Sequence, residues 1–155
     1  MQEYKPVFLT NDFTEFTQTG ADRLTILSRI LQKKHIPFSI IPIDDKKHIY
    51  IQFEQHSYSP LFKIKTVLIH YDKDPDSQGA NDNSACVFQV IEWIESLIAA
   101  NTVHNMRIFF TDGEEIGCAT EQGSFGIASR FKKLGLTNDE VFVLDGCGRG
   151  DVLVI

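Results

Sequence analysis

The sequence has few cysteines, no long apolar run and no basic run, and each absence excludes a class of protein. Its three cysteines, Cys86, Cys118 and Cys147, are widely spaced and form no CxxC pair, which favours a reduced, cytosolic protein. No apolar stretch approaches the roughly 20 residues that span a bilayer, and the N-terminus has no signal-peptide core, so no membrane partner is expected. Fifteen Lys and Arg face 21 Asp and Glu, with no basic run longer than Lys33-Lys34, so no nucleic-acid partner is expected either.

What the sequence contains is typical of one acidic globular domain. The chain has 155 residues, of which 43% are hydrophobic and 23% charged, so it can bury a core. We find no internal repeat, low-complexity tract or long linker, and we expect a single cytoplasmic domain over residues 1–155. Residues 1–20 are polar, which predicts a loosely ordered lead-in.

The hydrophobic periodicity predicts alternating strands and helices. Asp22 is placed to cap the first helix, and Pro37 and Pro42 bracket an extended edge strand. The second half reads strand, helix, strand, helix, strand, which predicts an α/β sandwich with a largely parallel sheet. The predicted helices cover residues 22–34, 84–100 and 126–134, and the predicted strands cover residues 38–41, 48–53, 66–69, 107–111, 141–144 and 152–155.

Polar side chains follow the carboxyl ends of three of these strands. His70 and Asp72 follow the first, Glu114 and Glu115 the second, and Asp145 the third. Ligands bind beyond the carboxyl ends of parallel strands, so we expect these clusters to converge. The loop over residues 79–83 adds a further carboxylate, Asp82, just before the long helix.

A histidine and several carboxylates packed together indicate a cation, because their repulsion needs an opposite charge. Imidazole and carboxylate ligands suit Zn²⁺, Mn²⁺ or Co²⁺. In an extended chain His70 and Asp72 point the same way, so Asp72 can brace the imidazole. Glu114 and Glu115 point differently, so one can bind metal while the other acts as general base. This is the layout of a metal hydrolase.

Each residue taken alone also has a structural interpretation. His70 is compatible with a hydrogen-bonded structural histidine, the glutamate pair with a solvated turn, and Asp145 with a turn formed with Gly146. Packing is the favoured role for Cys86. The other N-terminal histidines are expected at the surface: His35, His48 and His56.

Together, the segments His70-Tyr71-Asp72, Gly79-Ala80-Asn81-Asp82-Asn83, Gly113-Glu114-Glu115 and Val143-Leu144-Asp145 resemble the co-catalytic zinc aminopeptidases. That family includes bacterial leucyl aminopeptidases, glutamate carboxypeptidases and glutaminyl cyclases. The order and the spacing of the segments agree, over about residues 66–148. The resemblance implies a three-layer α/β/α sandwich with a mixed, mainly parallel sheet, and a zinc-dependent exopeptidase acting on a peptide or aminoacyl substrate.

The resemblance also implies a role for each site residue. His70 and Asp145 would bind one zinc ion, Asp82 would bridge two, and Glu115 would bind the second. Glu114 would be the general base, with Asp72 supporting His70.

The sequence departs from this family in one ligand. Members carry a further zinc-binding His beyond the last Asp, and no His follows His104 here. The chain therefore looks truncated before that ligand, and we expect one or two zinc ions with a weakened second site. An apolar strand over residues 152–155 would need a cover, such as a second copy in a homo-oligomer. Two alternative functions follow: a truncated, non-catalytic binding or assembly module, and a glutaminyl-cyclase-like acyltransferase with a single zinc.

Overall fold

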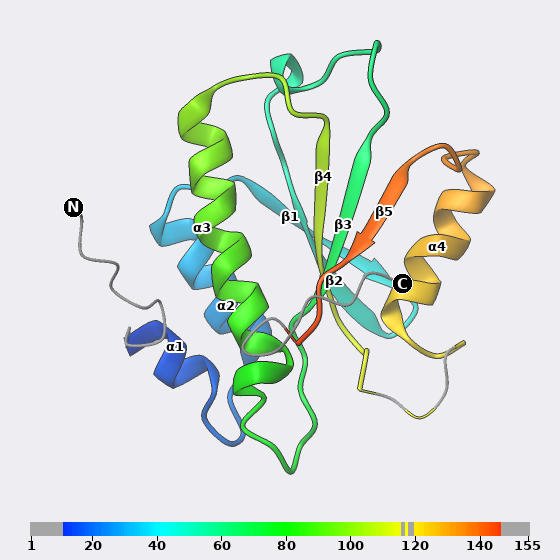
Figure 1. Cartoon of the computed structure of the whole chain (residues 1–155). Helices are drawn as coiled ribbons and strands as arrows, with labels where there is room; N and C mark the ends of the chain where they lie inside the picture. The colour runs from blue at the N-terminus through cyan, green and yellow to red at the C-terminus, as the bar shows by residue number, and fades with distance from the viewer. Residues whose placement is uncertain (1–10, 116, 118–119, 147–155) are drawn as a thin grey trace.

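A mixed five-stranded sheet with helices on both faces forms the centre of the molecule (Figure 1). The structure is a computed structural model and describes residues 11–115, 117 and 120–146. The strand order is β1-β2-β4-β3-β5. The strands are β1 (Phe38–Ile43), β2 (Lys46–Ile51), β3 (Lys65–His70), β4 (Met106–Thr111) and β5 (Glu140–Val143).

The parallel half of the sheet comes from the second half of the chain, as the alternation of strands and helices predicts. β3 lies between β4 and β5 and is parallel to both. Apolar β-branched and aromatic residues fill β3 and β4, and both strands are largely buried because helices cover both of their faces. The carboxyl ends of the three strands therefore meet at one edge.

The antiparallel half is the hairpin of β1 and β2, which joins the sheet through β4. Pro42 lies in β1, and β1 is an edge strand, the position where a missing N–H costs no ladder hydrogen bond. The predicted edge strand is confirmed.

One face of the sheet carries the larger part of the core. Helices α1 (Asn11–Phe16), α2 (Arg23–Lys33) and α3 (Ala85–Ala100) pack there, lying together on one side of the sheet in Figure 1. The sheet residues that they cover alternate along the strands, as with Val67 and Ile69. Asp22 caps the N-terminus of α2 as predicted, because its Oδ1 accepts a hydrogen bond from the Thr25 N–H at 3.1 Å.

Among the described residues, α4 (Gly123–Lys133) is the helix that covers the opposite face. Leu68 and Phe109 point to this side, and Ile127 of α4 packs on them in a smaller cluster. The helices on the two faces and the sheet between them form three layers, so the predicted α/β/α sandwich with a mixed sheet is confirmed. Two short helical turns complete the described elements: η2 (Gln55–Ser57) and η3 (Ala80–Ser84).

Three details differ from the predictions. Residues 11–16 form α1, whose Phe13 and Phe16 are buried, so the loosely ordered lead-in is wrong for that segment. Helix α4 begins at Gly123, earlier than predicted. His48 is fully buried on the α4 side of the sheet, whereas a surface position was expected. The predicted strand 152–155 lies outside the described residues.

None of the helices in the described segments is both long enough and apolar enough to span a membrane.

Candidate metal centre

His70 is the last residue of β3 and lies at the edge where the parallel strands end. It is paired in register with Thr111 of β4, and β5 reaches the same edge on the other side. Its side chain is only 5% exposed. A buried imidazole needs polar partners, and it finds them among the acidic residues beyond the strand ends.

Three of the predicted ligands come together around this imidazole. One atom from each of His70, Asp82 and Glu115 lies within 4.8 Å of the others. The Nε2 atom of His70 lies 3.0 Å from Asp82 Oδ1 and 3.4 Å from Asp145 Oδ1. All four predicted ligands therefore lie at one place, although they come from four segments of the chain.

Asp82 reaches the site through an irregular turn. Gly79 begins the turn with φ +56°, and Asp82 itself has non-helical φ and ψ of −114° and 93° within η3. The peptide bond between Asp82 and Asn83 is cis. The buried Asn83 side chain donates from Nδ2 to the Leu144 carbonyl at 2.8 Å, so the segment carrying Asp82 is bonded to the segment carrying Asp145.

Asp72 links two of the ligands, as the spacing of His70 and Asp72 predicts. Its Oδ1 lies 3.5 Å from His70 Nδ1, the ring nitrogen that faces away from Asp82. Its Oδ2 accepts a hydrogen bond from the Glu115 N–H at 3.0 Å. One carboxylate therefore contacts the His70 ring and fixes the backbone of Glu115.

Glu114 occupies a different position from its neighbour Glu115. Its Oε2 accepts a hydrogen bond from Ser124 Oγ at 3.1 Å, and its carbonyl accepts one from Gln122 Nε2, also at 3.1 Å. Both partners lie at the start of α4. The two adjacent glutamates thus point to different surroundings, as a division between ligand and base requires.

The charges of the site shift the pKa values of its groups. Burial alone would lower the pKa of His70, but the carboxylates of Asp72, Asp145 and Asp82 raise it to about 9. Burial acts to raise the pKa of Asp72, yet His70 and two backbone N–H groups hold it below its usual value. Burial and the nearby Asp82 raise the pKa of Glu115. The carboxylates of Asp72, Asp82 and Asp145 therefore stabilise positive charge at this point of the sheet edge.

The donor set fits zinc. Zinc bonds to imidazole nitrogen and carboxylate oxygen are about 2.0–2.2 Å long, so ligand atoms on one tetrahedral ion lie roughly 3.3 Å apart. The distances from His70 Nε2 to Asp82 and Asp145, 3.0 and 3.4 Å, are close to that separation. The side chains of Asp82 and Asp145 are 60% and 57% exposed, so the group is open to solvent.

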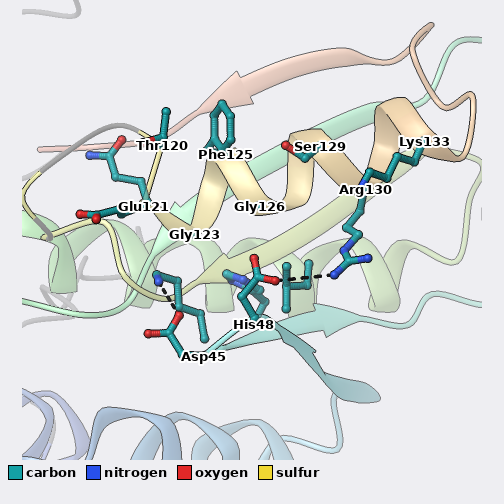
Figure 2. A pocket seen from close by; sticks show the side chains of 14 residues that line it. Asp45, His48, Thr120, Glu121, Gly123, Phe125, Gly126, Ser129, Arg130 and Lys133 are labelled. Carbon is teal, nitrogen blue, oxygen red and sulfur yellow. Dashed lines mark hydrogen bonds and ion pairs between the residues drawn. The ribbon is translucent and has the colours of Figure 1, made fainter.

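A separate hollow of about 550 Å³ lies between the turn of the β1–β2 hairpin and α4 (Figure 2). Figure 2 shows Asp45 and His48 on the hairpin side and Phe125 on the helix side. Two of its cations are paired with acids, since Lys46 bonds to Asp45 at 2.7 Å and Arg130 lies 3.7 Å from Asp44. None of the four predicted ligands lines this hollow, so it is distinct from the metal centre.

Sequence reasoning missed three residues that support the site: Arg23, Asn83 and Ser124. Arg23 did carry a signal, because it shares the apolar face of α2 with Ile26, Leu27 and Ile30, where a charge is unusual. Asn83 and Ser124 are ordinary loop and helix-start residues, and nothing in their spacing marks them.

The oxidation state of the cysteines differs in part from the prediction. Cys86 is buried in α3, which confirms a packing position, but it is disulfide-bonded, so the predicted reduced state is wrong there. Cys118 and Cys147 lie outside the described residues.

Comparison with solved structures identifies the fold. A glutaminyl cyclase from an Acidobacteriales bacterium superposes with a TM-score of 0.63 at 14% identity, covering 92% of this chain and 58% of that one. The LapA aminopeptidase of Legionella pneumophila gives 0.63 at 14% identity, covering 91% and 42%. A glutaminyl cyclase of Macrostomum lignano gives 0.59 at 19% identity, covering 89% and 53%. The chain thus spans about half the length of these proteins.

Sequence comparison supplies the family. No curated protein matches the chain significantly. The sequence pattern of peptidase family M28, in contrast, matches residues 63–154, which include every predicted ligand and more than half of the chain. With the same residues gathered at one sheet edge, the chain belongs to peptidase family M28 and is a domain of the zinc-peptidase type.

Proposed function

We propose that this domain is a zinc-dependent exopeptidase of the aminopeptidase type, with His70, Asp82, Glu115 and Asp145 as metal ligands and Glu114 as general base. The observation that carries the proposal is the position of the ligand atoms of His70, Asp82 and Glu115 within 4.8 Å of one another. The membership of peptidase family M28 supports a peptide or aminoacyl substrate.

Zinc bound to this group would act as a Lewis acid that polarises the scissile carbonyl and lowers the pKa of water. The chain's own residues would supply the proton transfers. The Glu114 carboxylate would take the proton of the attacking water and deliver it to the leaving amine. Ser124 supports this role, because its hydroxyl donates to Glu114 Oε2 and fixes one carboxylate oxygen.

Asp72 would act as a support for two ligands. Its contact with His70 Nδ1 would favour the ring orientation in which Nε2 faces the metal. The hydrogen bond that it accepts from the Glu115 N–H would fix the backbone of Glu115, the second ligand. We propose that the number of ions is one or two.

The test compares the zinc-loaded wild type with Glu114→Gln on aminoacyl-anilide substrates. Glu114→Gln keeps the shape of the side chain but cannot accept the proton, so we expect about a 100-fold or greater loss of turnover with zinc content unchanged. Glu121→Gln, an exposed glutamate of the same loop, is the matched control and should keep wild-type turnover. Wild-type protein that takes up no zinc and cleaves no substrate would refute the proposal.

Glutaminyl-cyclase-like acyl transfer is a second candidate, and the structural similarity to two glutaminyl cyclases favours it. The same protein should then cyclise an N-terminal glutamine peptide with release of ammonia. A non-catalytic binding module is the third candidate. It predicts neither cleavage nor cyclisation while the fold and the metal group stay intact.

The cytosolic location remains a prediction that Cys86 argues against, because disulfides persist mainly in oxidising compartments. Free-thiol titration of protein recovered from the native cell, with and without reductant, distinguishes the two states. A homo-oligomer likewise remains a proposal.

A further inference from the structure

Arg23, the first residue of α2, is a buried cation. It is 5% exposed, and its guanidinium carbon lies 4.4 Å from the centre of the Phe16 ring. Burying a guanidinium is costly unless its donors are satisfied, so a position like this requires a dense set of acceptors.

The acceptors of Arg23 are neutral groups. Main-chain carbonyls accept five of the hydrogen bonds and a hydroxyl accepts the sixth. They are the carbonyls of Phe16 (3.1 Å), Tyr71 (3.0 Å), Asp72 (3.2 Å), Gln78 (3.0 Å) and Gly79 (3.4 Å), and Ser84 Oγ (2.8 Å). Because none of these partners is a carboxylate, Arg23 keeps its positive charge available to the groups around it.

These acceptors belong to the two segments that carry the metal ligands. Tyr71 and Asp72 directly follow His70, whereas Gln78, Gly79 and Ser84 flank Asp82. One planar side chain therefore bonds to the end of β3 and to the Asp82 turn at the same time. The hydroxyl of Ser84 also donates to the Gly79 carbonyl, which closes the turn on itself.

The turn is shaped to receive the guanidinium. A Cβ atom at Gly79 would lie 2.8 Å from Arg23 Nη2 and 2.8 Å from the Asp82 carbonyl. Gly79 also has φ +56°, which disfavours other residues. A side chain is therefore disfavoured here both by the backbone conformation and by the close approach of Arg23, Lys73 and the Asp82 carbonyl.

The charge of Arg23 acts on the same acidic groups. The carboxylates of Asp72, Asp82 and Glu115 all stabilise its protonated form, although burial lowers its pKa to about 10. By the same attraction, Arg23 offsets part of the repulsion among these carboxylates before any metal binds.

We propose that Arg23 is the positioning residue of the metal centre, holding the end of β3 and the segment 78–84 at the separation at which His70 and Asp82 bind one ion. The inference rests on the proposed zinc site and adds a residue that touches neither metal nor substrate.

The test measures the zinc affinity of the full chain by competition with a chromophoric chelator. Arg23→Met removes all the hydrogen-bond donors. Arg23→Lys keeps the positive charge but loses the planar guanidinium with its fixed donor directions. We expect roughly a 100-fold weaker affinity for Arg23→Met and roughly a 10-fold weaker affinity for Arg23→Lys, the range seen when groups that orient ligands are lost. Arg29 is the matched control on the same helix, since it pairs with Glu15 at the surface. Arg29→Met should stay within about twofold of wild type.

A second readout separates positioning from simple stability. The absorption spectrum of the Co²⁺-loaded protein reports ligand geometry, so Arg23→Lys should change its band intensities while Arg29→Met leaves them unchanged. Wild-type zinc affinity and an unaltered Co²⁺ spectrum in both Arg23 variants would overturn the inference. A wild type that binds no zinc would instead refute the proposed function itself.

Ser84→Ala keeps the inference testable if the Arg23 variants do not fold. This change removes one acceptor of Arg23 and leaves the guanidinium in place. We expect roughly a 3- to 10-fold loss of zinc affinity. A folded Ser84→Ala protein with unchanged affinity would then count against the inference.

Discussion

The Nε2 atom of His70 lies 3.0 Å from the Oδ1 atom of Asp82, although one residue ends a buried strand and the other lies in an exposed turn. This contact joins the two parts of the chain that the sequence pattern predicts to converge. It also makes Asp82 the ligand whose loss should be most damaging.

Asp82→Asn should abolish tight zinc binding, because the amide keeps the size of the side chain but loses its charge. We expect a loss larger than the 10- to 100-fold range typical of groups that only orient ligands. Chelator competition on the purified chain measures it. Asp76→Asn, an exposed aspartate of the same loop, should bind zinc like the wild type. Equal affinity for Asp82→Asn and Asp76→Asn would remove Asp82 from the ligand set.

Asp72→Asn should weaken zinc binding by roughly 10- to 100-fold, since an amide stabilises the His70 ring and the Glu115 N–H less well than a carboxylate. The pKa of Asp72 lies below its usual value, so the charged form is the one present near neutral pH. Turnover per bound zinc should fall less than affinity. A variant with full affinity would show that Asp72 has no supporting role.

His48 should make the fold sensitive to mild acid. Burial lowers its pKa in the folded state below 6.5, although Asp112 opposes the shift, so protonation favours unfolding. The stabilising contribution is complete above about pH 6.5 and is lost as the pH falls through the folded pKa.

His48→Asn should reduce this sensitivity, because Asn can still accept the hydrogen bond from the Asp112 N–H and does not titrate. Urea unfolding at about pH 7.5 and about pH 5 gives the comparison. The free energy of unfolding should drop less in the variant than in the wild type. Equal drops in the two proteins would show that His48 is not the titrating group.

The outer edge of the sheet at β5 predicts self-association. Val141, Phe142 and Val143 are 59%, 47% and 67% exposed, which is high for apolar residues of a strand. Val143→Lys should therefore shift the sedimentation profile toward the monomer. Val103→Lys, at a 51% exposed valine outside the sheet, should leave the profile as it is in the wild type. A wild type that is monomeric at high concentration would contradict this prediction.

The fold was largely predictable because its signals are local. The continuous apolar run of β3 and the helical periodicity of α3 each define an element without tertiary information. Helix α1 was missed because it is short and its two core residues, Phe13 and Phe16, lie among polar neighbours. Such a helix forms only through packing, which a window of sequence does not reveal.

The convergence of the site was predictable, whereas its supporting residues were not. His70, the Glu114-Glu115 pair and Asp145 follow the ends of parallel strands, which predicts that they meet at one sheet edge. The choice of Glu115 rather than Glu114 as ligand depends on the family resemblance and remains a prediction. Arg23 carried a signal in its place on the apolar face of α2, but its role was missed because five of its six acceptors are main-chain carbonyls, which every residue possesses. His48 was placed at the surface because its neighbours on β2 do not show which face α4 covers.

The position of Arg23 on the same face of α2 as Ile26, Leu27 and Ile30 has a consequence for redesign of this domain. Each residue of a helix turns about 100° from the one before it, so a single insertion between Arg23 and Ile26 would swing the guanidinium away from its carbonyls while the rest of α2 stays packed. The first turn of α2 therefore tolerates substitution on its exposed side far better than a change in length.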